Sequence, residues 1–145
     1  MILETRHLSK IYGNKRAVHN LNLQIKAGSF TAILGPNGAG KFTTIQMLTR
    51  LLQPTTGEIL YNSNIKLGVV FQNSVLDDML TVRENLDIRA GQYNMIDKGK
   101  VDSLIEQLGL KKFSTQLYGT LSGGQKRRVD IARALLNNPD VLFLD

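Results

Sequence analysis

Nine consecutive residues constrain this chain more than any others, namely Gly35, Pro36, Asn37, Gly38, Ala39, Gly40, Lys41, Phe42 and Thr43. They fit the pattern G-x-x-x-x-G-K of loops that bind phosphate groups. Glycine tolerates positive φ and has no Cβ, so the backbone can turn its N–H groups toward an anion. The apolar run 30–34 precedes the loop, and a helical pattern from Lys41 to about Leu52 follows it. We therefore predict a strand, a phosphate loop and a helix whose positive end faces the ligand.

The loop departs from the pattern at Phe42. A Ser or Thr is expected there, because its hydroxyl ligates Mg²⁺, while Lys41 reaches the β- and γ-phosphates. Thr43 is not a simple replacement, since adjacent residues on a helix point about 100° apart. The alternative is an ordinary turn, because the glycine spacing arises by chance in roughly a few per cent of chains of this length. The strand and helix predicted on either side favour the phosphate loop.

Composition bounds the class of protein. The chain has 145 residues, 42% hydrophobic and 21% charged, which suits one domain with one core. No apolar run approaches the roughly 18 residues of a membrane span, and the first residues lack a signal peptide's apolar stretch, so we expect a cytoplasmic location. The absence of Cys excludes disulfides and thiolate metal sites. The net charge of +6 is spread in pairs, which indicates a solvated surface rather than a nucleic-acid site.

Hydrophobic patterning predicts the order of strands. Leu21, Leu23 and Ile25 alternate with polar residues, as in a half-buried antiparallel strand. The runs 30–34 and 67–71 do not alternate, which is typical of strands covered on both faces. The predicted strands are residues 2–8, 17–25, 30–34, 58–62, 67–71 and 141–144.

Three helices are predicted after residue 80. Thr81 and Glu84 have capping-box spacing, and so do Ser122 and Gln125. Between them, residues 100–108 carry an apolar stripe that Gly109 ends. We interpret the chain as one domain over residues 1–145, with a helical insert at about 81–120.

The second informative run is Leu121, Ser122, Gly123, Gly124 and Gln125. It arises by chance in roughly one of several thousand chains of this length. It is either a plain helix start or a second phosphate site, because a Ser hydroxyl and two glycine N–H groups at a helix N-terminus suit an anion. The presence of a phosphate loop in the same chain favours the second interpretation.

Together with the apolar run 141–144 that ends at Asp145, these motifs resemble the ATP-binding subunit of ABC (ATP-binding cassette) transporters over the whole chain. The resemblance implies an α/β P-loop NTPase fold of ABC type, with a mostly parallel core, an N-terminal antiparallel β patch and a helical subdomain. It also implies ATP and Mg²⁺ as cofactors, a transmembrane permease and a second ATP-binding subunit in a head-to-tail dimer as partners, and no nucleic acid. The location it implies is peripheral, at the cytoplasmic face of the cell membrane.

The resemblance also implies residue roles. Tyr12 would stack on adenine beside the loop residues 35–43, and the signature residues 121–125 would grip the γ-phosphate held by the opposite subunit. Gln72 would contact Mg²⁺ and the attacking water, and Asp145 would hold Mg²⁺ through water. The stretch 68–86 resembles drug and antibiotic exporters more than nutrient importers.

Several departures put hydrolysis in doubt. The family pattern continues after this aspartate with a glutamate and later a histidine, so no catalytic set is complete here. The family's sheet also places a further strand between the phosphate-loop strand and the one ending at Asp145. We therefore expect a truncated or decaying copy, or a fragment, whose C-terminal core is missing. Two functions stay open, a transport ATPase subunit and a non-catalytic nucleotide-binding or interaction remnant. A ribosome- or DNA-associated member is disfavoured, because there is no basic block.

Other polar residues are predicted to be structural or exposed. His7 and His19 lie far in sequence from every motif, without a third ligand at metal spacing. The run 126–128 is Lys-Arg-Arg, and we predict it to be a solvated face of its helix.

Overall fold

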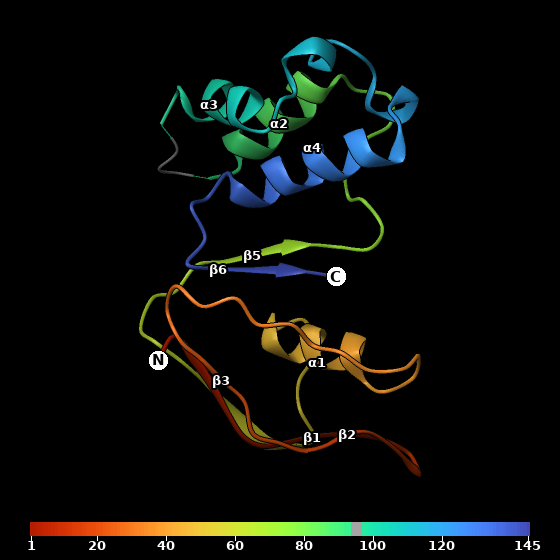
Figure 1. Ribbon diagram of the computed structural model, residues 1–145, viewed down its shortest axis with the longest axis vertical. Helices are drawn as coiled ribbons and strands as arrows, with labels where there is room; N and C mark the ends of the chain where they lie inside the picture. The colour runs from red at the N-terminus through yellow and green to blue at the C-terminus, as the bar shows by residue number, and fades with distance from the viewer. Residues whose placement is uncertain (94–96) are drawn as a thin grey trace. The chain divides into compact units, whose positions relative to one another are not determined.

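The computed structural model describes residues 1–93 and 97–145. They form two compact units, Met1–Ile65 and Lys66–Asp145, which we call the N-terminal and C-terminal units and describe separately (Figure 1). Residues 94–96 fall within the predicted helical insert and lie outside the described residues.

The N-terminal unit is a four-stranded antiparallel sheet with one helix. The central strand β1 (Leu3–Tyr12) pairs with β2 (Lys15–Leu21), β3 (Gln24–Ile25) and β4 (Thr56–Tyr61). The helix α1 (Lys41–Leu48) lies on the concave face of the curved sheet (Figure 1). Side chains at one face of β1 and β2 form a core with it, namely Leu8, Val18 and Met47. This confirms the predicted N-terminal antiparallel patch.

The single strand predicted over residues 17–25 is interrupted between β2 and β3. Thr5, a buried residue of β1, places its hydroxyl between the two pieces: it donates to Leu21 O and accepts from Leu23 N, each at 2.9 Å. The Asn22 side chain likewise accepts the His7 N–H at 2.9 Å. Because side chains replace ladder bonds here, the backbone bulges. The alternation of half-buried and exposed residues nevertheless persists to Ile25.

The strand predicted over residues 30–34 is wrong. Residues 30–34 have no regular secondary structure, and Phe30 and Leu34 are 91% and 89% exposed. A strand needs a neighbouring strand to bond its N–H and C=O groups, and among the described residues no backbone hydrogen bond involves residues 30–34. An apolar, β-branched sequence therefore does not become a strand by itself.

The helix predicted from Lys41 to about Leu52 ends earlier, at Leu48. Arg50 takes positive φ (64°) and its N–H bonds to Met47 O at 3.0 Å, which closes the helix as a glycine usually does. The Arg50 guanidinium lies 4.0 Å from the centre of the Tyr61 ring, and the Tyr61 hydroxyl donates to Leu48 O at 2.8 Å. These contacts with β4 compensate for the unusual backbone and fix where α1 ends.

The C-terminal unit has three helices and a parallel pair of strands. The strands are β5 (Leu67–Val70) and β6 (Val141–Leu144). The helices are α2 (Val82–Gly91), α3 (Lys100–Gln107) and α4 (Gly123–Leu135), with 3-10 turns at Lys111–Phe113 and Tyr118–Thr120. α4 lies between the strand pair and the other two helices (Figure 1). One apolar core joins the three helices, formed by Val82, Leu86, Val101, Leu104, Ile105, Leu110, Phe113, Tyr118, Leu121, Val129, Ala132 and Leu136.

The predicted helix boundaries are confirmed in this unit. Both capping boxes are present, Thr81 with Glu84 and Ser122 with Gln125. Gly109, which follows α3, has φ of 66°. The antiparallel sheet, the parallel pair and the helices together confirm the α/β fold class. Among the described residues, no helix is long and apolar enough to span a bilayer.

Candidate nucleotide site

The phosphate loop leads into α1 through two glycines with positive φ, Gly38 (83°) and Gly40 (86°). The Ala39 N–H bonds to Pro36 O at 3.1 Å, which tightens the turn. Gly40 is the N-cap of α1, and in the described structure no side chain caps this helix. The first N–H groups of a helix have no partner within it, so this end offers donors and a positive dipole to an anion.

Gly40 is also the point at which the loop is attached to the sheet. A Cβ at this position would lie 2.2 Å from Ala17 O of β2, far inside van der Waals contact. The position therefore requires glycine for two reasons, its positive φ and its close approach to backbone. The start of α1 is thereby fixed relative to β2.

Lys41 folds back over the loop. Its Nζ donates to Gly35 O at 2.5 Å and to Pro36 O at 2.8 Å. An ammonium has three donors, so one is left after these two bonds. The charge is thus held beside the open helix end, where a phosphate oxygen could accept the remaining bond.

Phe42 leaves the loop without the expected metal ligand. Its side chain is 54% exposed and contains no oxygen. The nearby Thr44 hydroxyl is buried and donates to Gly40 O at 2.9 Å, within α1 itself. Of the carboxylates in the N-terminal unit, both Glu4 and Glu58 pair with Arg6. The side chains of this unit therefore do not fit Mg²⁺.

Tyr12 lies at the end of β1 in the same unit as the loop. Its side chain is 47% exposed, and the Lys10 Nζ lies 5.4 Å from the ring centre. About half of the side-chain surface is thus open to solvent, and the predicted stacking of this ring on adenine stays a prediction.

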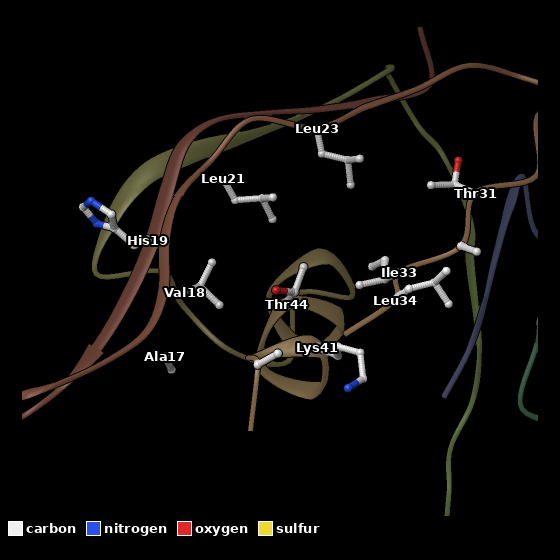
Figure 2. A pocket seen from close by; sticks show the side chains of 12 residues that line it. Ala17, Val18, His19, Leu21, Leu23, Thr31, Ile33, Leu34, Lys41 and Thr44 are labelled. Atoms are coloured by element: carbon white, nitrogen blue, oxygen red, sulfur yellow. The ribbon is translucent and has the colours of Figure 1, made fainter. Parts of the chain in front are cut away.

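A cavity of about 440 Å³ borders the loop on the side of β2 (Figure 2). Its walls are mainly apolar, including Val18, Leu21, Leu23, Ile33 and Leu34. Such a lining does not suit a polyphosphate, which needs polar donors. The cavity lies beside residues 31–34, which do not form the predicted strand.

The two histidines are exposed, as predicted. The His7 ring nitrogen Nδ1 lies 2.8 Å from Asn20 Oδ1. The His19 ring points away from α1, on the other side of β2 (Figure 2).

In the C-terminal unit, the structure brings Gln72 and Asp145 to the same end of the parallel pair. Val70 of β5 is in register with Leu144 of β6, and the Asp145 N–H bonds to Val70 O at 3.0 Å. Gln72 is exposed two residues beyond β5. The carboxyl ends of parallel strands are where ligands bind in such sheets, and the roles predicted for Gln72 and Asp145 stay predictions.

The prediction of a solvated run at residues 126–128 is wrong for Arg127. Its guanidinium is partly buried and donates to Phe71 O at 2.8 Å and to Asp145 O at 2.7 Å. It therefore holds together the two segments that carry Gln72 and Asp145. The strand pair leaves carbonyl groups unpaired at this end, and a long cation from α4 satisfies them.

The neighbours of Arg127 behave differently. Lys126 lies 3.5 Å from Asp78 Oδ1 and 5.1 Å from the Tyr118 ring centre, so it also has specific partners. Arg128 is exposed, as predicted for the whole run.

Of the signature residues, Ser122, Gly123 and Gly124 are exposed and Gln125 is half-buried. Leu121 is buried in the helical core. Ser122 Oγ accepts the Gln125 N–H at 3.3 Å, and Gln125 Oε1 accepts the Ser122 N–H at 3.0 Å. Nothing lies within 4 Å of a Cβ built at Gly123 or Gly124, so the two glycines face open space.

A buried polar cluster was missed by the sequence analysis. Asp130 of α4 is buried, and its Oδ1 accepts from Ser74 Oγ at 2.6 Å and from the Tyr118 hydroxyl at 3.0 Å. Burial raises the pKa of Tyr118 to about 12, and the charge of Asp130 adds to that increase. The sequence signal for this cluster was Asp130 itself, a charged residue that follows Val129 on the apolar stripe of α4.

Comparison with known proteins identifies the family. The sequence model of the family described as "ABC transporter" matches residues 18–145. This chain belongs to that family. The match covers the phosphate loop, the signature and the segment ending at Asp145, which confirms the resemblance drawn from those motifs.

Curated relatives agree with the family. The bacitracin transport ATP-binding protein BcrA of Bacillus licheniformis is 38% identical over 154 residues, covering 99% of this chain and 50% of that protein. The zinc import ATP-binding protein ZnuC of Mannheimia succiniciproducens is 36% identical over 146 residues, covering 99% of this chain and 54% of that protein. The chain spans about half the length of these relatives.

A solved structure agrees as well. The dimeric ATP-binding cassette MJ0796, bound to ADP and Pi in a post-hydrolysis state, is 33% identical with a TM-score of 0.84. The match covers 99% of this chain and 73% of that one. That cassette is thus a dimer that holds ADP and Pi.

Proposed function

We propose that this chain binds ATP as the nucleotide-binding part of an ABC transporter subunit. The observation that carries the proposal is the uncapped start of α1, whose free N–H groups lie beside the Lys41 ammonium. Residues 35–43 hold the phosphates, and Tyr12 stacks on the adenine. Family membership supports this assignment.

The partners follow from the same family. We propose a head-to-tail dimer in which residues 121–125 contact the γ-phosphate held by the second subunit, and a permease at the inner face of the membrane. The open space at Gly123 and Gly124 supports the dimer, because a partner's phosphate can approach there.

Export is the direction we propose for transport. It rests on the stretch 68–86 alone, because importers are also among the relatives.

We propose that this chain hydrolyses ATP too slowly to support transport. Phosphoryl transfer needs a bridging cation and a positioned water together, and Phe42 removes one ligand of that cation. Loss of members of one catalytic unit is non-additive, so Phe42→Ser alone recovers little. Gln72 and Asp145 are each present, but they do not replace the missing hydroxyl.

Phe42 also favours a second function, nucleotide binding without catalysis. A site with its backbone cradle and Lys41 intact can still bind ATP after losing the hydroxyl. The two functions differ in one measurable quantity, the release of phosphate.

An ATP titration tests the binding proposal. Lys41→Ala should weaken ATP affinity by about 10-fold or more, since it removes a charge-assisted bond to phosphate. Lys26→Ala removes the same charge from an exposed position of the same unit and should change the affinity less than about 2-fold. Equal affinities for the native chain and Lys41→Ala would show that the phosphate-loop assignment is wrong.

A phosphate-release assay tests the proposal on hydrolysis. We expect no Mg²⁺-dependent turnover above background for the native chain or for Phe42→Ser. Substantial turnover by either would contradict it.

A further inference from the structure

We propose that the phosphate loop of this chain selects metal-free ATP over the magnesium complex of ATP, and that Phe42 determines this selection. The inference rests on the proposed ATP binding and adds the chemical form of the ligand. It follows from the oxygen atoms that the N-terminal unit places near the loop.

Hydroxyl groups near the loop are poorly placed for a cation. Phe42 contributes none, and the Thr44 hydroxyl is buried and donates to Gly40 O. Thr43 is only partly exposed and points about 100° away from position 42 around the helix axis. The first turn of α1 therefore presents a phenyl ring where a ligand oxygen is needed.

Two carbonyl groups of the loop are occupied too. Gly35 O and Pro36 O, the two that face the Lys41 ammonium, both accept its hydrogen bonds. A divalent cation at these oxygens would have to displace that ammonium and would lie beside its charge. Lys41 and Mg²⁺ would thus compete for the same two carbonyl oxygens.

Carboxylates are scarce in this unit and lie elsewhere. Residues 1–65 contain no Asp and two Glu. Arg6 pairs with both, at 2.9 Å from Glu4 and 3.6 Å from Glu58. Mg²⁺ requires a near-octahedral set of oxygens and gives up its waters reluctantly. An exposed phenyl ring offers those waters no hydrogen-bond acceptor.

Charge favours the metal-free nucleotide. Residues 1–65 carry seven Lys and Arg against the two Glu. Metal-free ATP has about two more negative charges than its magnesium complex, so a positive unit with an open helix end attracts it more strongly. The same ligand also accepts the third Lys41 bond without competition from a bound cation.

Isothermal titration of the native chain with ATP, in EDTA and in excess Mg²⁺, tests the inference. We expect the native chain to bind ATP more tightly in EDTA than in excess Mg²⁺. Phe42→Ser restores the hydroxyl that ligates Mg²⁺ in this loop pattern. Because loss of even an outer-shell partner of a metal costs about 10-fold or more, Mg²⁺ should tighten the ATP affinity of this variant by about 10-fold. Phe42→Leu keeps an apolar side chain without the ring and should behave as the native chain does. This control separates the hydroxyl from the change in size.

The outcomes separate this inference from the proposed function. Equal affinity under the two conditions, or tightening by Mg²⁺, in the native chain would overturn the inference and leave ATP binding standing. Loss of that tightening in Thr43→Ala would then name Thr43 as the ligand. Absence of a Mg²⁺ effect in Phe42→Ser would overturn the role of Phe42. No heat of binding under either condition would overturn the proposed function itself.

Discussion

The starts of α1 and α4 are both rich in glycine, and they manage their free N–H groups in opposite ways. α1 begins at Gly40 with no side-chain cap, while α4 begins at Ser122 with both bonds of a capping box. At α4 the capping box satisfies two donors, the N–H groups of Ser122 and Gln125, whereas at α1 no side chain of the described residues satisfies any. Sequences with similar composition can therefore give a closed helix end or an open one.

The uncapped start of α1 lowers the stability of this helix, and contacts with the sheet compensate for it. A helix of eight residues without a cap is marginal in isolation. Here the Gly40 backbone fits against Ala17, and Met47 packs in the core with β1 and β2. The sheet thus holds the helix in place and leaves its first turn available.

The largest effect is expected at the glycine that fixes the open end. Gly40→Ala forces positive φ on an L residue and drives a Cβ into Ala17 O, so it should lower the free energy of unfolding by about 3 kcal/mol or more. Gly38→Ala is the matched control, because its φ is similar and nothing lies within 4 Å of its Cβ. It should cost about 1–2 kcal/mol in denaturant unfolding. Equal losses would show that the contact with Ala17 is unimportant.

A second test uses pH and the buried cluster on α4. The pKa of Tyr118 is about 12 in the folded chain and about 10 when unfolded, so the folded state binds the proton more tightly. This stabilisation is complete below pH 10 and is lost as pH rises to 12, by about 2 kcal/mol. Tyr118→Phe should flatten this slope in unfolding measured against pH. A native chain whose stability is constant between pH 10 and 12 would contradict the buried position of this hydroxyl.

The smallest effect concerns the caps themselves. Ser122→Ala removes the cap of α4 and should cost about 1 kcal/mol of unfolding free energy. Asn37→Ala, in the exposed loop before α1, should cost less than about 0.5 kcal/mol. A cap-like loss at Asn37, seen in chemical denaturation, would mean that α1 also has a side-chain cap.

Local signals explain what the sequence predicted well. Capping boxes at Thr81 and Ser122 need only residues three apart, and both were read from spacing. The glycine loop and the signature are also short, continuous patterns. Their chemistry could therefore be predicted before their positions in space were known.

Long-range pairing explains what was missed. Arg127 bonds to Phe71, and Asp130 to Ser74, each across 56 residues. No local pattern marks such partners, and a solvated face was the wrong prediction for Arg127. The run 30–34 failed for the same reason, because a strand depends on a neighbour that its own residues cannot indicate.

Backbone amide chemical shifts during an ATP titration in EDTA test the open and closed helix ends most directly. At protein concentrations low enough to keep the chain monomeric, the account predicts that ATP shifts the amides of Gly38, Gly40, Lys41 and Phe42. The amides of Gly123, Gly124 and Gln125 should keep their positions. Shifts in the second group, with none in the first, would contradict it.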